Sequence, residues 1–114
     1  MKNIELLSKI CSVAGAPGHE KKIRDFIIGE IKKEGLSYSL DNIGNLTVTI
    51  KGKKEKRVMV AAHMDEIGFI VKHIDEKGFV FFHPLGGFDP KTLTSQRVVT
   101  VSYTHLTLPT SQYV

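Results

Sequence analysis

The chain has 114 residues, of which 41% are hydrophobic and 25% charged, a composition that excludes a disordered or collagen-like protein. Lys and Arg exceed Asp and Glu by four, but the charges are interleaved, so we expect no nucleic-acid partner. No apolar run approaches the roughly 20 residues that span a bilayer, so we expect no membrane partner. Glu5 comes too early for a signal peptide. Because the single cysteine, Cys11, has no internal disulfide partner, a cytoplasmic location is predicted.

The first third of the chain has the spacing of two amphipathic helices. Apolar residues recur at helical intervals over Ile4–Val13, and the Gly- and Pro-rich segment Gly15–Gly18 ends that pattern. A second helix is predicted over Glu20–Glu34, with Gly35 as the residue that follows its C-terminal cap. The residues expected on its buried face are Ile23, Phe26, Ile27 and Ile31.

After the second helix the period of the apolar pattern changes to two. Short strands are predicted over Ser37–Leu40 and Leu46–Ile50, joined by a turn at Asp41–Asn45. The charged segment Lys51–Arg57 is predicted to be a surface connection. The run Val58–Ala62 is apolar without alternation, which predicts a strand covered on both faces within an α/β sheet.

Beyond residue 66 the pattern becomes all-β. A parallel strand normally leads into a crossover helix, but here a turn follows at Asp75–Gly78 and a loop at Pro84–Pro90. We therefore expect a β domain inserted into the α/β domain. Its predicted strands are Ile67–Ile74, Phe79–Phe82 and Gln96–Thr100.

The pair His63-x-Asp65 lies where the predicted buried strand ends. Sites in open α/β sheets gather at the carboxyl ends of strands, and a period of two places both side chains on one side. A neutral imidazole is a good zinc ligand, and a neighbouring carboxylate can fix its tautomer. One His and one Asp do not complete a metal site, and the spacing alone also fits an ordinary surface pair.

Four motifs, in order along the chain, resemble those of the M42 metallo-aminopeptidases, the family of glutamyl aminopeptidases and TET peptidases. The segment Ala61–Val71 is similar to the metal-ligand segment of that family. The resemblance covers residues 1–100. The other matching segments are Ala16–Glu20, Asp41–Leu46, and Gly86–Pro90 with Leu93 and Gln96–Val98 after it.

The resemblance implies an α/β fold class and a division of the chain. Residues 1–66 are expected to be the N-terminal portion of a mixed-sheet zinc-peptidase domain. Residues 67–100 are expected to begin an inserted all-β, barrel-like dimerisation domain.

The same resemblance implies an aminopeptidase that hydrolyses N-terminal residues from peptides. It implies two divalent metal ions, zinc or cobalt, and assembly into a homododecamer. His63 is the expected metal ligand, and Asp65 the catalytic carboxylate that orients it. The general base and the other ligands of the family have no matching position here. We therefore expect the 114-residue chain itself to be inactive.

The last fourteen residues contain no Lys, Arg, Asp or Glu. Val101–Thr110 resembles the translation of a transposase sequencing adapter, read as GTC TCT TAT ACA CAT CTG ACG CTG CCG ACG. Ser111–Tyr113 then fit an arbitrary index, and Val114 fits the fixed codon before a stop. We expect residues 101–114 to be a non-native tail, excluded from fold prediction. The alternative is a genuine C-terminal strand and tail.

Most other residues that could carry chemistry are expected to be structural. Cys11 lies on a helical apolar stripe and is expected to be a core residue, not a nucleophile. Asp89 and Arg97 are expected to support the β domain. The histidines expected at surface or strand positions are His19, His73 and His83, and His105 lies in the tail.

Two other functions remain open. In one, the strands from Ile67 to Thr100 form a non-catalytic module that pairs with another subunit. In the other, the protein is a hydrolase of the endoglucanase-labelled kind known among its relatives. Hydrolysis of a glycoside ordinarily needs a pair of positioned carboxylates, and no such pair is visible in this sequence.

Overall fold

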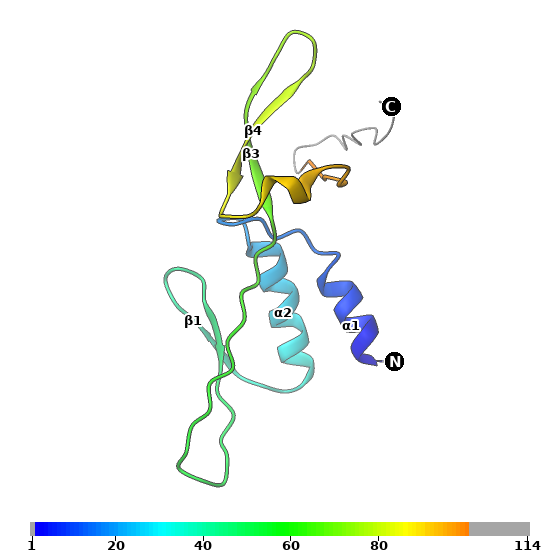
Figure 1. Cartoon of the computed structure of the whole chain (residues 1–114). Helices are drawn as coiled ribbons and strands as arrows, with labels where there is room; N and C mark the ends of the chain where they lie inside the picture. Colours follow the sequence, from blue (N-terminus) through cyan, green and yellow to red (C-terminus); the bar gives the residue numbers. More distant parts are fainter. Residues whose placement is uncertain (1, 101–114) are drawn as a thin grey trace.

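The computed structural model describes residues 2–100 (Figure 1). The predictions for residues 101–114, including His105, lie outside this range. Two helices are followed by two hairpins and a short 3-10 helix. The elements are α1 (Lys2–Ile10), α2 (Lys21–Lys33), β1 (Tyr38–Leu40), β2 (Leu46–Val48), β3 (Gly68–Ile74), β4 (Val80–Leu85) and η1 (Pro90–Leu93).

Helix α2 ends as its sequence predicts. Gly35 has a φ of +70°, a left-handed conformation that glycine adopts without strain. Its N–H donates to the carbonyl of Lys32 (3.0 Å), and the N–H of Leu36 donates to the carbonyl of Ile31 (3.2 Å). These two bonds define a Schellman motif, which satisfies carbonyls that the end of the helix leaves unpaired. The predicted C-terminal glycine is confirmed.

The two helices lie side by side (Figure 1), and the hydrophobic core of the described residues lies on α2. Ile23 on α2 is 2% exposed and is the single buried hydrophobic residue among those described. Phe26, Ile27 and Ile31 are half-buried, so the predicted face is correct but only partly covered. Helix α1 ends at Ile10, three residues before its predicted end.

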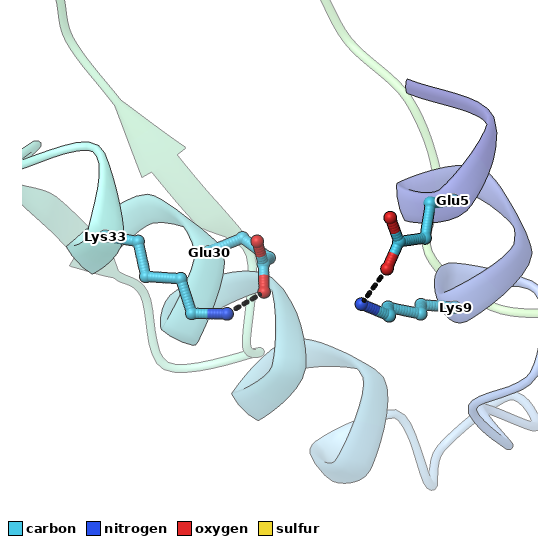
Figure 2. Close-up of polar contacts among 4 residues, drawn as sticks. All are labelled: Glu5, Lys9, Glu30 and Lys33. Carbon is cyan, nitrogen blue, oxygen red and sulfur yellow. Dashed lines mark hydrogen bonds and ion pairs between the residues drawn. The ribbon is translucent and has the colours of Figure 1, made fainter. Parts of the chain in front are cut away.

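Ion pairs form between side chains one helical turn apart on α1 and on α2 (Figure 2). On α1, Lys9 Nζ lies 2.8 Å from Glu5 Oε1, and this hydrogen bond lowers the pKa of Glu5. On α2, Lys33 pairs with Glu30. Both lysines and Glu5 are more than half exposed, so screening by water keeps the contribution of these pairs to stability small.

The strands form two separate antiparallel hairpins, β1–β2 and β3–β4. Strand β4 runs to Leu85, so the loop predicted to begin at Pro84 starts later. Pro84 lies opposite Phe69, and a two-stranded hairpin tolerates a proline because each strand has a free edge. A register shift between Val71 and His73 interrupts the ladder.

The predicted buried strand at Val58–Ala62 is wrong for this chain. The segment has no strand assignment, and Val58, Met59 and Val60 are 89%, 88% and 92% exposed. A strand covered on both faces needs neighbours on two edges and two faces, and residues 2–100 place no such partners around it.

The strand predicted at Gln96–Thr100 is also absent from the described residues. Residues 96–100 have no helix or strand assignment, and the short helix η1 lies before them, beginning at Pro90. The Asp89 carboxylate accepts the N–H of Lys91 (3.0 Å) and so caps this short helix.

In residues 2–100, neither helix has the length and apolar character that crossing a bilayer requires.

Candidate functional site

His63 and Asp65 are brought together in the segment before β3. His63 Nδ1 lies 3.1 Å from Asp65 Oδ1 and 3.0 Å from the backbone oxygen of Asp65. Since both neighbours are acceptors, the geometry places a proton on Nδ1, and in the neutral ring Nε2 then presents its lone pair. This is the arrangement by which a carboxylate fixes the tautomer of a metal-binding histidine.

The next residue, Glu66, ties this segment to the loop between the helices. Its N–H donates to the carbonyl of Gly15 (2.9 Å), and its Oε1 accepts the N–H of Gly15 (2.9 Å). Sequence analysis did not find this pair. The two residues are 51 positions apart, and Gly15 carried only the signal of a helix breaker.

Two clefts flank the segment. One, of about 230 Å³, lies between His63 and Asp65 on one side and the loop at Gly86–Phe88 on the other. The second, of about 520 Å³, runs under the helices and is lined by Ile23 and Cys11. His63, Asp65 and Glu66 border both clefts, so the polar cluster stands at their junction.

The donor chemistry fits part of a metal site. The His63 side chain is 84% exposed and that of Asp65 40%, so Nε2 is open to an incoming ligand. Within residues 2–100, no group of three or more His, Cys, Asp or Glu side chains is placed to hold a metal ion. Zinc takes three or four protein ligands, so further ligands would have to come from other residues.

Two other candidate residues, His73 and Asp89, lie outside both clefts. The His73 ring contacts the Phe81 ring on the β3–β4 hairpin, with centroids 5.8 Å apart. Asp89 has the structural role expected of it, as the cap of η1. Cys11 was expected in the core, but its thiol is free and exposed, and Leu7 on the same apolar stripe of α1 is exposed as well.

Comparison with known proteins identifies the family. The model of the M42 glutamyl aminopeptidase family matches residues 44–109, a range that includes the His63–Glu66 segment. The chain therefore belongs to the M42 peptidase family. The matched range also extends beyond Thr100 into the segment that resembles an adapter.

Named aminopeptidases are among the relatives. A lysyl aminopeptidase of Pyrococcus furiosus is 40% identical, over 86% of this chain and 28% of that protein. A glutamyl aminopeptidase of Lactococcus lactis subsp. cremoris is 32% identical, over 96% of this chain and 31% of that protein. The chain thus spans less than a third of the length of the curated relatives it matches.

A solved structure has the same fold. The crystal structure of an endoglucanase from Thermotoga maritima superposes with a TM-score of 0.67 and 38% identity. The match covers 83% of this chain and 30% of that chain. It supports an α/β arrangement for this part of the fold.

Proposed function

We propose that this chain is the N-terminal part of an aminopeptidase that uses two divalent metal ions, zinc or cobalt, to hydrolyse N-terminal residues from peptides. His63 is the proposed metal ligand and Asp65 the carboxylate that orients it. The observation that carries the proposal is the 3.1 Å contact between His63 Nδ1 and Asp65 Oδ1, which leaves Nε2 available. Membership of the M42 family and relatives named as aminopeptidases support it.

The residues of this chain have distinct parts in that chemistry. His63 presents one neutral nitrogen, and Asp65 holds the proton on the opposite nitrogen of the same ring. A bound metal pair would lower the pKa of a water molecule and polarise the scissile carbonyl. Gly86, Gly87 and Phe88 bound the cleft on its other side.

The 114-residue chain alone is proposed to be inactive, because residues 2–100 place only one histidine and one carboxylate together. The test compares this chain with the full-length protein on aminoacyl p-nitroanilides with added Zn²⁺ or Co²⁺. Release of p-nitroaniline is expected from the full-length wild-type protein. Neither the 114-residue chain nor the full-length His63→Ala variant should release it. Metal-dependent release by the short chain would refute its inactivity, and an active full-length His63→Ala variant would refute the site.

A second candidate is glucan hydrolysis, favoured by the name of the Thermotoga maritima structure. Glycosidases usually need two carboxyl groups set apart across the scissile bond. Here the carboxylate of Glu66 is engaged by the N–H of Gly15, and Asp65 is engaged by His63. We therefore favour a peptide substrate. Parallel assays of the full-length protein on a peptide and on a soluble β-glucan discriminate between the two.

The β3–β4 hairpin supports a proposed role in assembly. Ile70, Val71, Phe81 and Phe82 are exposed large hydrophobic residues, and such side chains favour association. We propose that residues 67–100 begin a dimerisation domain of a cytoplasmic homododecamer. Size-exclusion chromatography with light scattering tests this. A catalytically silent oligomer would instead favour the non-catalytic assembly module.

The tail is a separate proposal. Residues 101–114 are proposed to be derived from a sequencing adapter, on the codon match described above. Resequencing the source locus without that adapter is expected to give a different reading frame after codon 100. A locus that encodes Val101–Val114 would overturn this assignment.

A further inference from the structure

We propose that Glu66 is a positioning residue for His63: by holding Gly15 with both its backbone and its side chain, it fixes where the His63–Asp65 pair lies. The inference rests on the proposed function, because it takes His63 to be a metal ligand. It adds a residue whose role follows from the geometry of this chain.

The first step is the pairing itself. Both polar groups of the Gly15 backbone go to Glu66, the carbonyl to its N–H and the N–H to its Oε1, each at 2.9 Å. A hydrogen bond to a carboxylate is stronger than one between neutral groups. Because Gly15 is buried, its N–H would lose a partner that water does not readily replace.

The second step is the rigidity of what Glu66 holds. A Cβ added at Gly15 would lie 2.7 Å from Ile23 Cγ2 and 3.4 Å from the backbone oxygen of Met64. Gly15 therefore packs directly on the one buried hydrophobic residue of α2 and on the residue next to His63. Glu66 is therefore hydrogen-bonded to a residue that itself packs on Ile23, the buried hydrophobic residue of the described chain.

The third step is a second contact between the same two segments. A Cβ added at Gly68 would lie 2.7 Å from Ala16 Cβ and 3.2 Å from Pro17 Cδ. Residues 64–68 therefore lie along residues 15–17, with Glu66 between two close approaches. A rotation of this segment would have to break the Glu66 bonds first.

The fourth step is the dependence of His63 on this anchor. The imidazole is hydrogen-bonded to Asp65 and is otherwise largely exposed. Asp65 directly precedes Glu66, so the hydrogen bonds of Glu66 to Gly15 also determine where the His63–Asp65 pair lies. Outer-sphere residues that orient a metal ligand change metal affinity by about ten- to a hundredfold when mutated.

The experiment uses the full-length protein with Zn²⁺ alone as the probe and compares three variants. Glu66→Ala removes the acceptor, and a zinc dissociation constant raised on the order of tenfold is expected. Glu66→Gln keeps an acceptor oxygen of the same reach, so rescue to within about twofold is expected. Glu55→Ala, an exposed glutamate in the connection before residue 58, is the matched control and should bind like the wild type.

Amide exchange supplies a readout that does not depend on metal or activity. The Gly15 amide should exchange faster in Glu66→Ala than in the wild type and stay protected in Glu66→Gln. If Glu66→Ala does not fold, Glu66→Asp replaces it, since its carboxylate is one methylene shorter and is withdrawn from Gly15.

The outcomes separate the two proposals. A folded Glu66→Ala variant that binds Zn²⁺ like the wild type overturns the positioning role, as does a Glu66→Gln variant as weak as Glu66→Ala. Zn²⁺ binding with the expected variant pattern but no peptidase activity upholds the positioning role and refutes the aminopeptidase. If the wild type binds no Zn²⁺, His63 is not a metal ligand, and the positioning role fails with it.

Discussion

Asp41 and Asp75 stand at the same position of two different hairpins and make the same backbone contacts. Oδ1 of Asp41 accepts the N–H groups of Ile43 (3.1 Å) and Asn45 (2.8 Å). Oδ1 of Asp75 accepts those of Lys77 (3.0 Å) and Phe79 (2.8 Å). In each turn the third residue after the aspartate is a glycine with positive φ. The chain thus closes both hairpins with one local solution, in which an Asp side chain replaces a backbone acceptor.

We predict that the β1–β2 turn loosens in acid because of Asp41. Hydrogen bonds from the backbone and side chain of Asn45 lower the pKa of Asp41 below its ordinary value of 3.8. A folded-state pKa below the unfolded one stabilises the fold above pH 3.8, and this stabilisation is lost as the pH falls through the lowered pKa. The protection factor of the Asn45 amide, which compares its exchange with that of an unstructured peptide at the same pH, should therefore fall below that pH. Asp41→Asn should remove this pH dependence, whereas an unchanged profile would contradict the prediction.

We predict opposite effects for alanine at two glycines. Gly68→Ala places a Cβ 2.7 Å from Ala16 Cβ and should destabilise the full-length protein by about 1–3 kcal/mol. Gly29 lies inside α2 with no atom within 4 Å of an added Cβ. Gly29→Ala should therefore stabilise by about 0.5–1 kcal/mol. Urea unfolding measures both, and equal shifts would argue against the close approach at Gly68.

We predict that His63→Ala abolishes high-affinity Zn²⁺ binding by the full-length protein, since it removes the proposed ligand. Asp65→Asn retains the imidazole ring of His63 but weakens control of its tautomer, so a loss of Zn²⁺ affinity of about ten- to a hundredfold is expected. Isothermal titration with Zn²⁺ measures both. His73→Ala is the control, because His73 lies on β3 against Phe81. A loss in His73→Ala equal to that in His63→Ala would place the metal elsewhere.

We predict that the 114-residue chain self-associates through its exposed apolar segment around Met59. Extended, unpaired and apolar backbone is a template for pairing with another chain. Met59→Lys should raise the monomer fraction in light scattering, because a charge on such a segment opposes pairing. Ser37→Lys, an equal charge change at another exposed position, should leave it unchanged. Equal effects of both substitutions would indicate a response to net charge alone.

The end of α2 and the turn at Asp41 could be predicted from the sequence, because each is determined by residues close together in the chain. The glycine at position 35 predicted the end of α2, and the Schellman bonds confirm it. The Asp41 turn was likewise predictable, because all its partners lie within four residues. Both depend on chemistry that is complete within one turn of the chain.

Non-local structure could not be predicted in the same way. The composition of Val58–Ala62 predicted a covered strand, but burial depends on partners that residues 2–100 do not supply. His63 and Asp65 were found because they are two residues apart, and they do lie in contact. Glu66 was missed because its partner is distant in the sequence and is a backbone group, which no side-chain motif records.

The contact between Gly15 and Glu66 also orders events during synthesis. Closing a loop of 51 residues cannot begin until Glu66 has left the ribosome, and ribosomes add about 5–20 residues per second. Roughly 3–10 s therefore pass between the synthesis of Gly15 and that of Glu66. During this interval the N–H and the carbonyl of Gly15, which are buried in the folded chain, are exposed to water or to chaperones. The segment from His63 to Glu66, which faces the proposed metal, therefore takes its shape only after both helices have been translated.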